Sequence, residues 1–353
     1  MAMLPIISTD QYVRIAVIDD YVSFIWTPRY YTSGDFELVI SIQHINLIHI
    51  GYHVERDDDE NIGIIEEIQI ERREDGQEVA IISGRFLISL LGRRIVARQS
   101  SFYQKSAGYV IGSLIFYNAM ETGVDPQTYR VIPDLETMEG MDEIGPDIDI
   151  QITGKNLLDA VSQICESTHI GIKAFRNSAG FIEVFLYEGT DRSINQSAVP
   201  HVIFSEQYDN LISSSYEENH KNIISAVLVA GEGEGLSRKM KWAELSTIAS
   251  GLNRYEYFKD ARNVQSNGGQ ISDEEYKDML KGVGNELLTQ YTQAFGAQVD
   301  FSNIKYKQDV NLGDLVTLRN ERWGVTATAR LVEVIESTDE SGMYTINPTF
   351  MME

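Results

Sequence analysis

The stretch 35–42, Asp-Phe-Glu-Leu-Val-Ile-Ser-Ile, has the clearest secondary-structure signal in the N-terminal part of the chain. Phe36, Leu38, Ile40 and Ile42 recur at every second position, which places them on the same side of an extended backbone. The pattern predicts a β-strand with one apolar face.

Segments on both sides of this stretch also have strand character. They are rich in β-branched and aromatic residues, and Asp75-Gly76 predicts a tight turn between two of them. Strands this closely spaced predict a sandwich or barrel. We assign residues 1–104 to a first β-barrel domain, which a strand from residues 200–216 could complete. The expected strands cover residues 12–18, 45–54, 64–71 and 78–83.

Helical periodicity begins after Gly84. Residues 105–121 predict a long helix, and residues 157–165 an amphipathic helix with its apolar residues on one face. A short helix over 85–91 precedes them, and a hairpin of strands over 172–187 follows. Residues 105–199 are therefore expected to form an α+β inserted domain.

A second β-rich half begins near Pro200. Within it, Ser272 and Glu275 form a capping box ahead of an apolar helical stripe. Because this helix lies between strands that must pair with each other, it predicts an insertion, residues 237–298, in a second β-barrel domain made of residues 200–236 and 299–353. The expected fold class is mainly β with α+β insertions, with two similar small β-barrel domains plus two smaller appended domains.

Acidic residues far outnumber basic ones, and the formal net charge is -24. This excess repels phosphate backbones and anionic lipid heads, so we expect no sequence-specific nucleic-acid binding and no membrane anchor. No stretch approaches the roughly 18 uninterrupted apolar residues of a membrane span, and the N-terminus lacks a secretion signal. The single cysteine, Cys165, is expected to be a buried small hydrophobe.

Several groups of residues suggest chemistry, but none has the required spacing. The glycines of 231–235 match neither the dinucleotide fingerprint nor the phosphate loop, and 57–61 resembles a calcium loop in composition only. His44, His49 and His53 lack the further ligand that a metal site usually adds. We expect no enzyme activity, no catalytic residues, no metal and no cofactor. The abundant carboxylates leave a paired-carboxylate glycosidase site open.

Three segments occur together in a recognisable order. They are Ser-Gly-Arg-Phe-Leu-Ile-Ser-Leu-Leu-Gly-Arg-Arg-Ile-Val at 83–96, Gly-Leu-Asn-Arg-Tyr-Glu at 251–256 with Lys-Asp-Ala-Arg at 259–262, and Asn-Leu-Gly-Asp-Leu-Val at 311–316. Together they resemble the tail-tip, or baseplate hub, proteins of siphophages and prophages. Those proteins are related to the cup-shaped baseplate hub subunit of contractile tails and to the type VI secretion spike protein.

The motif residues have structural roles that need no catalysis. Gly84 and Gly92 are expected to bracket a short helix, whose leucines plug the open end of the first barrel. Asp260 and Arg262 are expected to form an ion pair, and Asp314 to serve a turn. The structural motif residues are Gly84, Arg85, Gly92, Asp260, Arg262, Leu312, Gly313 and Asp314.

The resemblance implies a structural hub that joins the tail tube and distal tail ring to a distal fibre, spike or lysin. It further implies a homotrimer that meets the tape-measure protein and forms part of the DNA channel, in a virion tail assembled in the host cytoplasm. The chain ends just after its last expected strand, as a hub alone would. Two alternatives stay open. One is a receptor-binding module for a host surface glycan, of which Trp26, Trp242 and Trp323 would be the sign, and the other is a cell-wall-degrading enzyme.

Overall fold

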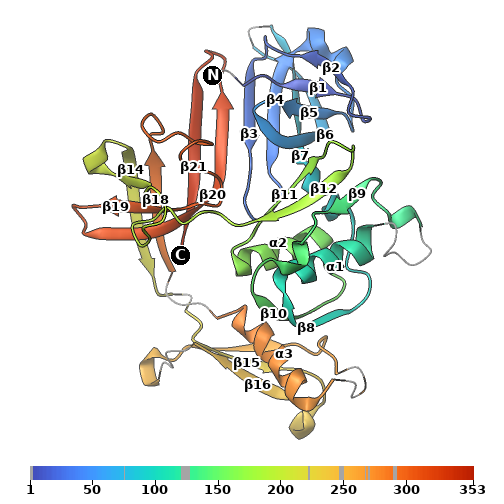
Figure 1. Cartoon of the computed structure of the whole chain (residues 1–353), viewed down its shortest axis with the longest axis vertical. Helices are drawn as coiled ribbons and strands as arrows, with labels where there is room; N and C mark the ends of the chain where they lie inside the picture. Colours follow the sequence, from blue (N-terminus) through green and yellow to red (C-terminus); the bar gives the residue numbers. More distant parts are fainter. Residues whose placement is uncertain are drawn as a thin grey trace.

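The computed structural model describes residues 3–74, 76–120, 128–221, 223–245, 250–266, 268, 271–288 and 292–353. In these residues the chain has two β-rich bodies and two smaller bodies that contain helices (Figure 1). The expected class, mainly β with α+β insertions, is confirmed. Asp75 of the expected tight turn lies outside the described residues.

The first β-rich body packs around one face of its strands. Phe36, Leu38 and Ile40 are almost fully buried beside Trp26, so the alternation correctly predicted the core face up to Ile40. Ile42, the last residue of the pattern, lies beyond the end of the strand, at the start of a 3-10 helix. The body contains β1 (Ile6–Ser8), β2 (Arg14–Val17), β3 (Ser23–Thr27), β4 (Asp35–Ser41), β5 (His53–Arg56), β6 (Asp59–Arg72) and β7 (Glu78–Phe86).

The strand expected over 45–54 is wrong in its first part. Residues Ile42–Leu47 form the 3-10 helix η1, and the strand β5 begins only at His53. Ile45 and Ile48 are three residues apart, and both pack on the core of the first β-rich body. A 3-10 turn brings residues with this spacing to the same side, which a strand does not.

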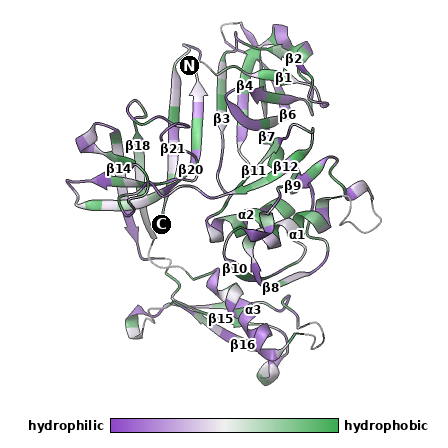
Figure 2. Ribbon diagram, viewed as in Figure 1, coloured by the Kyte–Doolittle hydropathy of each residue, from purple (hydrophilic) through white to green (hydrophobic). Residues whose placement is uncertain are grey.

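The α+β body shares one core with the segment that leads into it. Leu87 and Leu91 of the 3-10 helix η2 (Leu87–Arg93) join that core, so these leucines do not plug the first β-rich body as expected. Hydrophobic residues run along β11, β12 and the two helices (Figure 2). The other elements are β8 (Ser100–Ser106), α1 (Ala107–Ala119), β9 (Leu135–Thr137), β10 (Asp147–Ile152), α2 (Leu157–Thr168), β11 (Gly171–Arg176) and β12 (Ile182–Tyr187).

The second β-rich body and the body around α3 (Asp273–Asn285) are built from the remaining strands. Ser272 and Glu275 make the expected capping box at the start of α3. The strands β15 (Ala226–Ala230), β16 (Met240–Glu244) and β17 (Glu256–Asp260) form a sheet that α3 covers. We call this sheet together with α3 the α3 body. The second β-rich body contains β13 (Ile203–Ser205), β14 (Leu211–Asn219), β18 (Thr292–Val299), β19 (Leu315–Asn320), β20 (Val325–Thr338) and β21 (Tyr344–Met352).

One eleven-stranded sheet runs through both β-rich bodies. The strand β20 joins them, because residues 325–330 pair with β19 while residues 336–338 pair with β3. Its 14 residues are enough to serve both partners. The expected closure into barrels is therefore not found in the described part of the chain, where the strand path ends openly at β13 and β2.

The segment 200–216 does not complete the first β-rich body. Its strand β13 pairs with β19, and β14 pairs with β18, so both partners come from the C-terminal part of the chain. The strand β15, which lies within 200–236, pairs with β16 and β17 of the α3 body. Strand character was correct in these segments, but the partners depend on contacts between distant residues.

Candidate functional site

The two glycines of the first motif have different surroundings. Gly84 lies inside β7, where a Cβ would stand 1.7 Å from the carbonyl oxygen of Ile64. The close approach occurs beside a register shift in β6. Gly92 lies in η2, where a Cβ would meet Leu158 at an ordinary contact distance of 3.5 Å. Gly84 therefore permits a close approach of two strands and does not mark a helix boundary.

Arg85 of the same motif ties strands to the following helix through one carboxylate. Its Nε and Nη2 donate to Glu66 at 2.7 and 3.0 Å, and Nη2 of Arg93 donates to the same carboxylate at 3.2 Å. The hydrogen bonds from Arg85 lower the pKa of Glu66 below its ordinary value of 4.5, and they outweigh the opposite effect of partial burial. Glu66 thus links β6, β7 and η2.

The second motif lies at the end of β17 in the α3 body. The carboxylate of Asp260 accepts a hydrogen bond from the backbone N–H of Arg262 at 3.2 Å, and the Nε of Arg262 stands 3.6 Å from it. Arg238 makes the shorter contact, 2.6 Å to Asp260. This motif belongs to the α3 body and the other two motifs lie in other bodies, so the three motifs do not form one site.

The third motif lies where the α+β body meets the second β-rich body. Asp314 is buried, and its carboxylate accepts hydrogen bonds from the N–H of Thr190 at 2.7 Å, Nε of Arg192 at 2.8 Å and the N–H of Asn311 at 2.9 Å. The bond from Asn311 closes a local turn. The other two hold the segment that leaves the α+β body against the start of β19.

Tyr30 fills the centre of this junction. A Cβ on Gly313, which has φ +94°, would stand 2.2 Å from its ring. The buried hydroxyl has two acceptors within reach, the carbonyl oxygens of His169 at 3.1 Å and Tyr187 at 3.2 Å, and it accepts from the N–H of Gly189 at 3.0 Å. Leu312 packs against the cores of both bodies. Tyr30 carries no local sequence signal, because its partners lie far away along the chain.

A buried ion network joins the two β-rich bodies near the contact of β20 with β3. The side chain of Arg56 is 1 % exposed, and its Nη2 lies 3.0 Å from Glu336 and 2.5 Å from Asp58. Lys307 approaches Glu336 at 3.2 Å. The guanidinium of Arg56 lies 5.7 Å from the ring centroid of Trp26. Removal of one partner would leave an uncompensated buried charge, so this network favours one relative placement of the two bodies.

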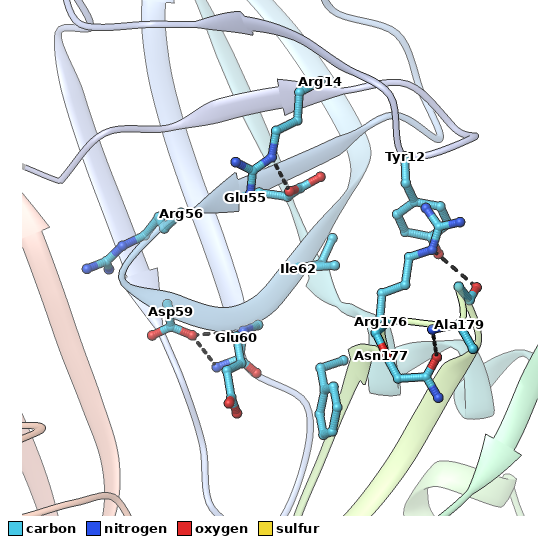
Figure 3. A pocket seen from close by; sticks show the side chains of 14 residues that line it. Tyr12, Arg14, Glu55, Arg56, Asp59, Glu60, Ile62, Arg176, Asn177 and Ala179 are labelled. Carbon is cyan, nitrogen blue, oxygen red and sulfur yellow. Dashed lines mark hydrogen bonds and ion pairs between the residues drawn. The ribbon is translucent and has the colours of Figure 1, made fainter.

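A pocket of about 680 Å³ lies between the first β-rich body and the β11–β12 hairpin (Figure 3). Tyr12 stacks on His53 with 4.3 Å between ring centroids, and the guanidinium of Arg176 lies 4.0 Å from the Tyr12 ring centroid. Arg14 pairs with Glu55 at 3.0 Å. These groups are engaged with one another, and the contacts tie two bodies of the chain together.

The histidines and the cysteine that the sequence analysis considered lie apart from one another. His44 contacts Asp20 at 2.8 Å, whereas Nδ1 of His53 lies 2.9 Å from the carbonyl oxygen of Thr9, and burial lowers the pKa of His53. Burial raises the pKa of Cys165 to about 12. In the part of the chain that the structure describes, no three His, Cys, Asp or Glu side chains gather so as to hold a metal. None of the described helices combines the length and the hydrophobicity needed to cross a bilayer.

Comparisons with known proteins agree with the resemblance noted in the sequence. No curated protein sequence matches the chain. Its fold is similar to that of a tail protein from Neisseria meningitidis MC58, at 13 % identity and a TM-score of 0.57 over 100 % of this chain and 97 % of that one. The 43 kDa tail protein of prophage MuSo2 from Shewanella oneidensis has 12 % identity and a TM-score of 0.57, over 99 % of this chain and 98 % of that one. The prophage tail protein gp18 from Listeria monocytogenes EGD-e has 10 % identity and a TM-score of 0.56, over 99 % of this chain and 94 % of that one.

At these identities the solved structures establish the fold alone. The family comes from a sequence model, described as Siphovirus ReqiPepy6 Gp37-like protein, which matches residues 5–350. That match covers nearly all of the chain and confirms the resemblance to siphophage tail proteins. The chain belongs to the Siphovirus ReqiPepy6 Gp37-like family of phage tail proteins.

Proposed function

We propose that this phage tail protein is the structural hub of a tail tip, joining the tail tube and distal tail ring to a distal fibre, spike or lysin. The observation that carries the proposal is the single sheet that runs through both β-rich bodies. A part that transmits load between tube and fibre needs bodies that move together. The shared strand β20, the Arg56–Glu336 contact and the Asp314 hydrogen bonds all support such coupling.

In the assembled tail, three copies would form a ring around a central channel. Two β-rich bodies per chain would present six related units, which lets a trimer meet a six-fold tube without a mismatch in symmetry. The net charge of -24 supports a channel that DNA passes without binding, because like charges avoid phosphate contacts. The test is a cryo-EM map of assembled tail tips in which the subunits are counted. Six copies of the chain, or a strongly basic channel wall, would contradict the proposal.

We also propose that the chain is not an enzyme. Its family consists of tail proteins, and the acidic and basic side chains around the pocket beside the β11–β12 hairpin are engaged with one another. A zymogram and a turbidity assay on host cell walls test this point. Clearing by the purified chain would instead favour a cell-wall hydrolase, and its loss in carboxylate variants would locate the site.

A further inference from the structure

The sheet of the α3 body has one face covered by α3 and one open face (Figure 1). Val227 and Ala243 pack under the helix, so their neighbours along each strand point to the other face. On that face Leu228 stands opposite Trp242 of β16 and opposite Phe258 of β17. Trp242 is 37 % exposed and Phe258 is 54 % exposed. Trp242, Leu228 and Phe258 thus form a line across the open face, which we call the aromatic row after its two ring residues.

One end of the aromatic row is braced by Arg254. Its guanidinium lies 5.1 Å from the ring centroid of Trp242. Two carboxylates hold it there, because Nη1 is 2.8 Å from Glu244 and Nε is 2.6 Å from Glu256. Glu244 and Glu256 stand opposite Ala226 on its two sides. The Trp242 ring is thus positioned beside a network of charged hydrogen-bonding groups.

The other end has an equivalent brace. The guanidinium of Arg238 lies 5.8 Å from the ring centroid of Phe258 and 2.6 Å from Asp260, and it donates to the carbonyl oxygen of Ala230 at 2.8 Å. Rings held in this way lose little rotational freedom when a ligand binds, which favours affinity. The open face therefore presents two partly exposed rings to a ligand, and each ring lies beside a guanidinium group that carboxylates hold.

The chemistry around the row favours a neutral saccharide. Exposed aromatic rings pack against the apolar C–H faces of sugar rings, while carboxylates and guanidinium groups hydrogen-bond to hydroxyls. Three carboxylates face three arginines here, because Arg262 also lies 3.6 Å from Asp260. Since the chain as a whole is strongly acidic, a phosphate-rich ligand is disfavoured. A flat apolar protein surface is disfavoured too, because it would desolvate these charged groups. Neighbouring strands lie about 4.8 Å apart. Trp242 and Phe258 lie on the two outer strands, so about 10 Å separates them across the sheet, and a ligand that contacts both must contain more than one sugar ring.

We propose that the open face of β16, β15 and β17 binds a neutral oligosaccharide, with Trp242 and Phe258 stacking on it. Arg254 and Arg238 are positioning residues that hold the two rings. This activity is separate from the hub role, which rests on the β-rich bodies and on subunit number. A trimeric hub without saccharide binding, and a saccharide-binding chain that is not trimeric, would therefore be distinguishable results.

The test uses the full-length chain on an array of neutral oligosaccharides that also carries sulfated glycans and teichoic acid. We expect selective retention on neutral oligosaccharides, and a loss of at least about tenfold in affinity for Trp242→Ala and for Phe258→Ala, since each stacking contact is worth about 1.4 kcal/mol. Phe258→Tyr should keep binding. Trp323→Ala is the matched control, because Trp323 is 51 % exposed outside the α3 body, and its affinity should not change.

A second measurement separates lost contacts from lost structure. In Trp323→Phe, Trp242 is the exposed tryptophan that remains, because Trp26 is fully buried. A bound neutral oligosaccharide should then protect the fluorescence from acrylamide quenching. Retention only on anionic polymers, an equal loss in Trp323→Ala, or unchanged quenching at saturating oligosaccharide would each overturn the proposal. So would an array on which no neutral oligosaccharide retains the chain.

Discussion

At the scale of single residues, Gly84 and Gly92 differ in the space around them. A methyl group at Gly84 would overlap the Ile64 carbonyl, whereas at Gly92 it would make an ordinary contact with Leu158. We therefore expect Gly84→Ala to lower the free energy of unfolding by about 1–3 kcal/mol. Gly92→Ala should change it by less than about 0.5 kcal/mol. Urea denaturation followed by circular dichroism measures both, and equal effects would contradict the contrast.

Asp314 is the second residue with a sharp expectation. Replacement by Ala leaves Arg192 without its carboxylate and two backbone N–H groups without their acceptor. Because buried donors without partners are costly, Asp314→Ala should destabilise the chain by about 3 kcal/mol. Thermal unfolding measures the loss. The exposed Asp19 is the control, and a similar loss in Asp19→Ala would show that the effect is one of net charge.

At the scale of elements, the contact between β6, β7 and η2 should depend on pH through Glu66. Its pKa is lower in the folded chain than its ordinary value of 4.5, so the unfolded chain binds the proton more tightly. The stabilisation is therefore complete above pH 4.5 and is lost as the pH falls through the lowered value. We expect Glu66→Gln to be less stable than the wild type at neutral pH, with a gap in melting temperature that narrows below pH 4.5.

The many other carboxylates also titrate in this range, so only the difference between the two proteins is informative. Glu340→Gln is a suitable control, because Glu340 pairs with Arg73 at the surface with a side chain that is 63 % exposed. Exposed pairs contribute little to stability. A gap between wild type and Glu66→Gln that stays constant with pH would mean that the Arg85 hydrogen bonds do not stabilise the fold.

At the scale of the whole molecule, cohesion comes from packed cores and from the contacts that join the bodies. Among the described residues, four hydrophobic clusters, one centred on each body, contain most of the buried apolar side chains. The Arg56 network joins the two β-rich bodies, and the Tyr30 junction joins the α+β body to the second β-rich body. We expect EDTA to leave the melting temperature unchanged, since these contacts involve side chains and backbone alone. A clear drop with EDTA, restored by one divalent cation, would show that a metal contributes to folding.

The sequence by itself was sufficient to predict features that depend on neighbours along the chain. The alternation of Phe36, Leu38 and Ile40 identified a core face, and the capping box at Ser272 located the start of α3, because both patterns arise from local backbone geometry. The motifs also pointed to the family. Asp314 was expected to serve a turn, and its bond from Asn311 is such a local contact.

Only the tertiary structure decided which strands pair and which side chains meet across bodies. The expected closed barrels gave way to one open sheet because β20 is long enough to pair with both β19 and β3, and no local pattern encodes that choice. Tyr30 and Arg56 were missed for the same reason. Their partners at Gly189 and Glu336 are far away in sequence, and the energy of a buried hydrogen bond or ion pair depends on the surroundings that the complete fold creates.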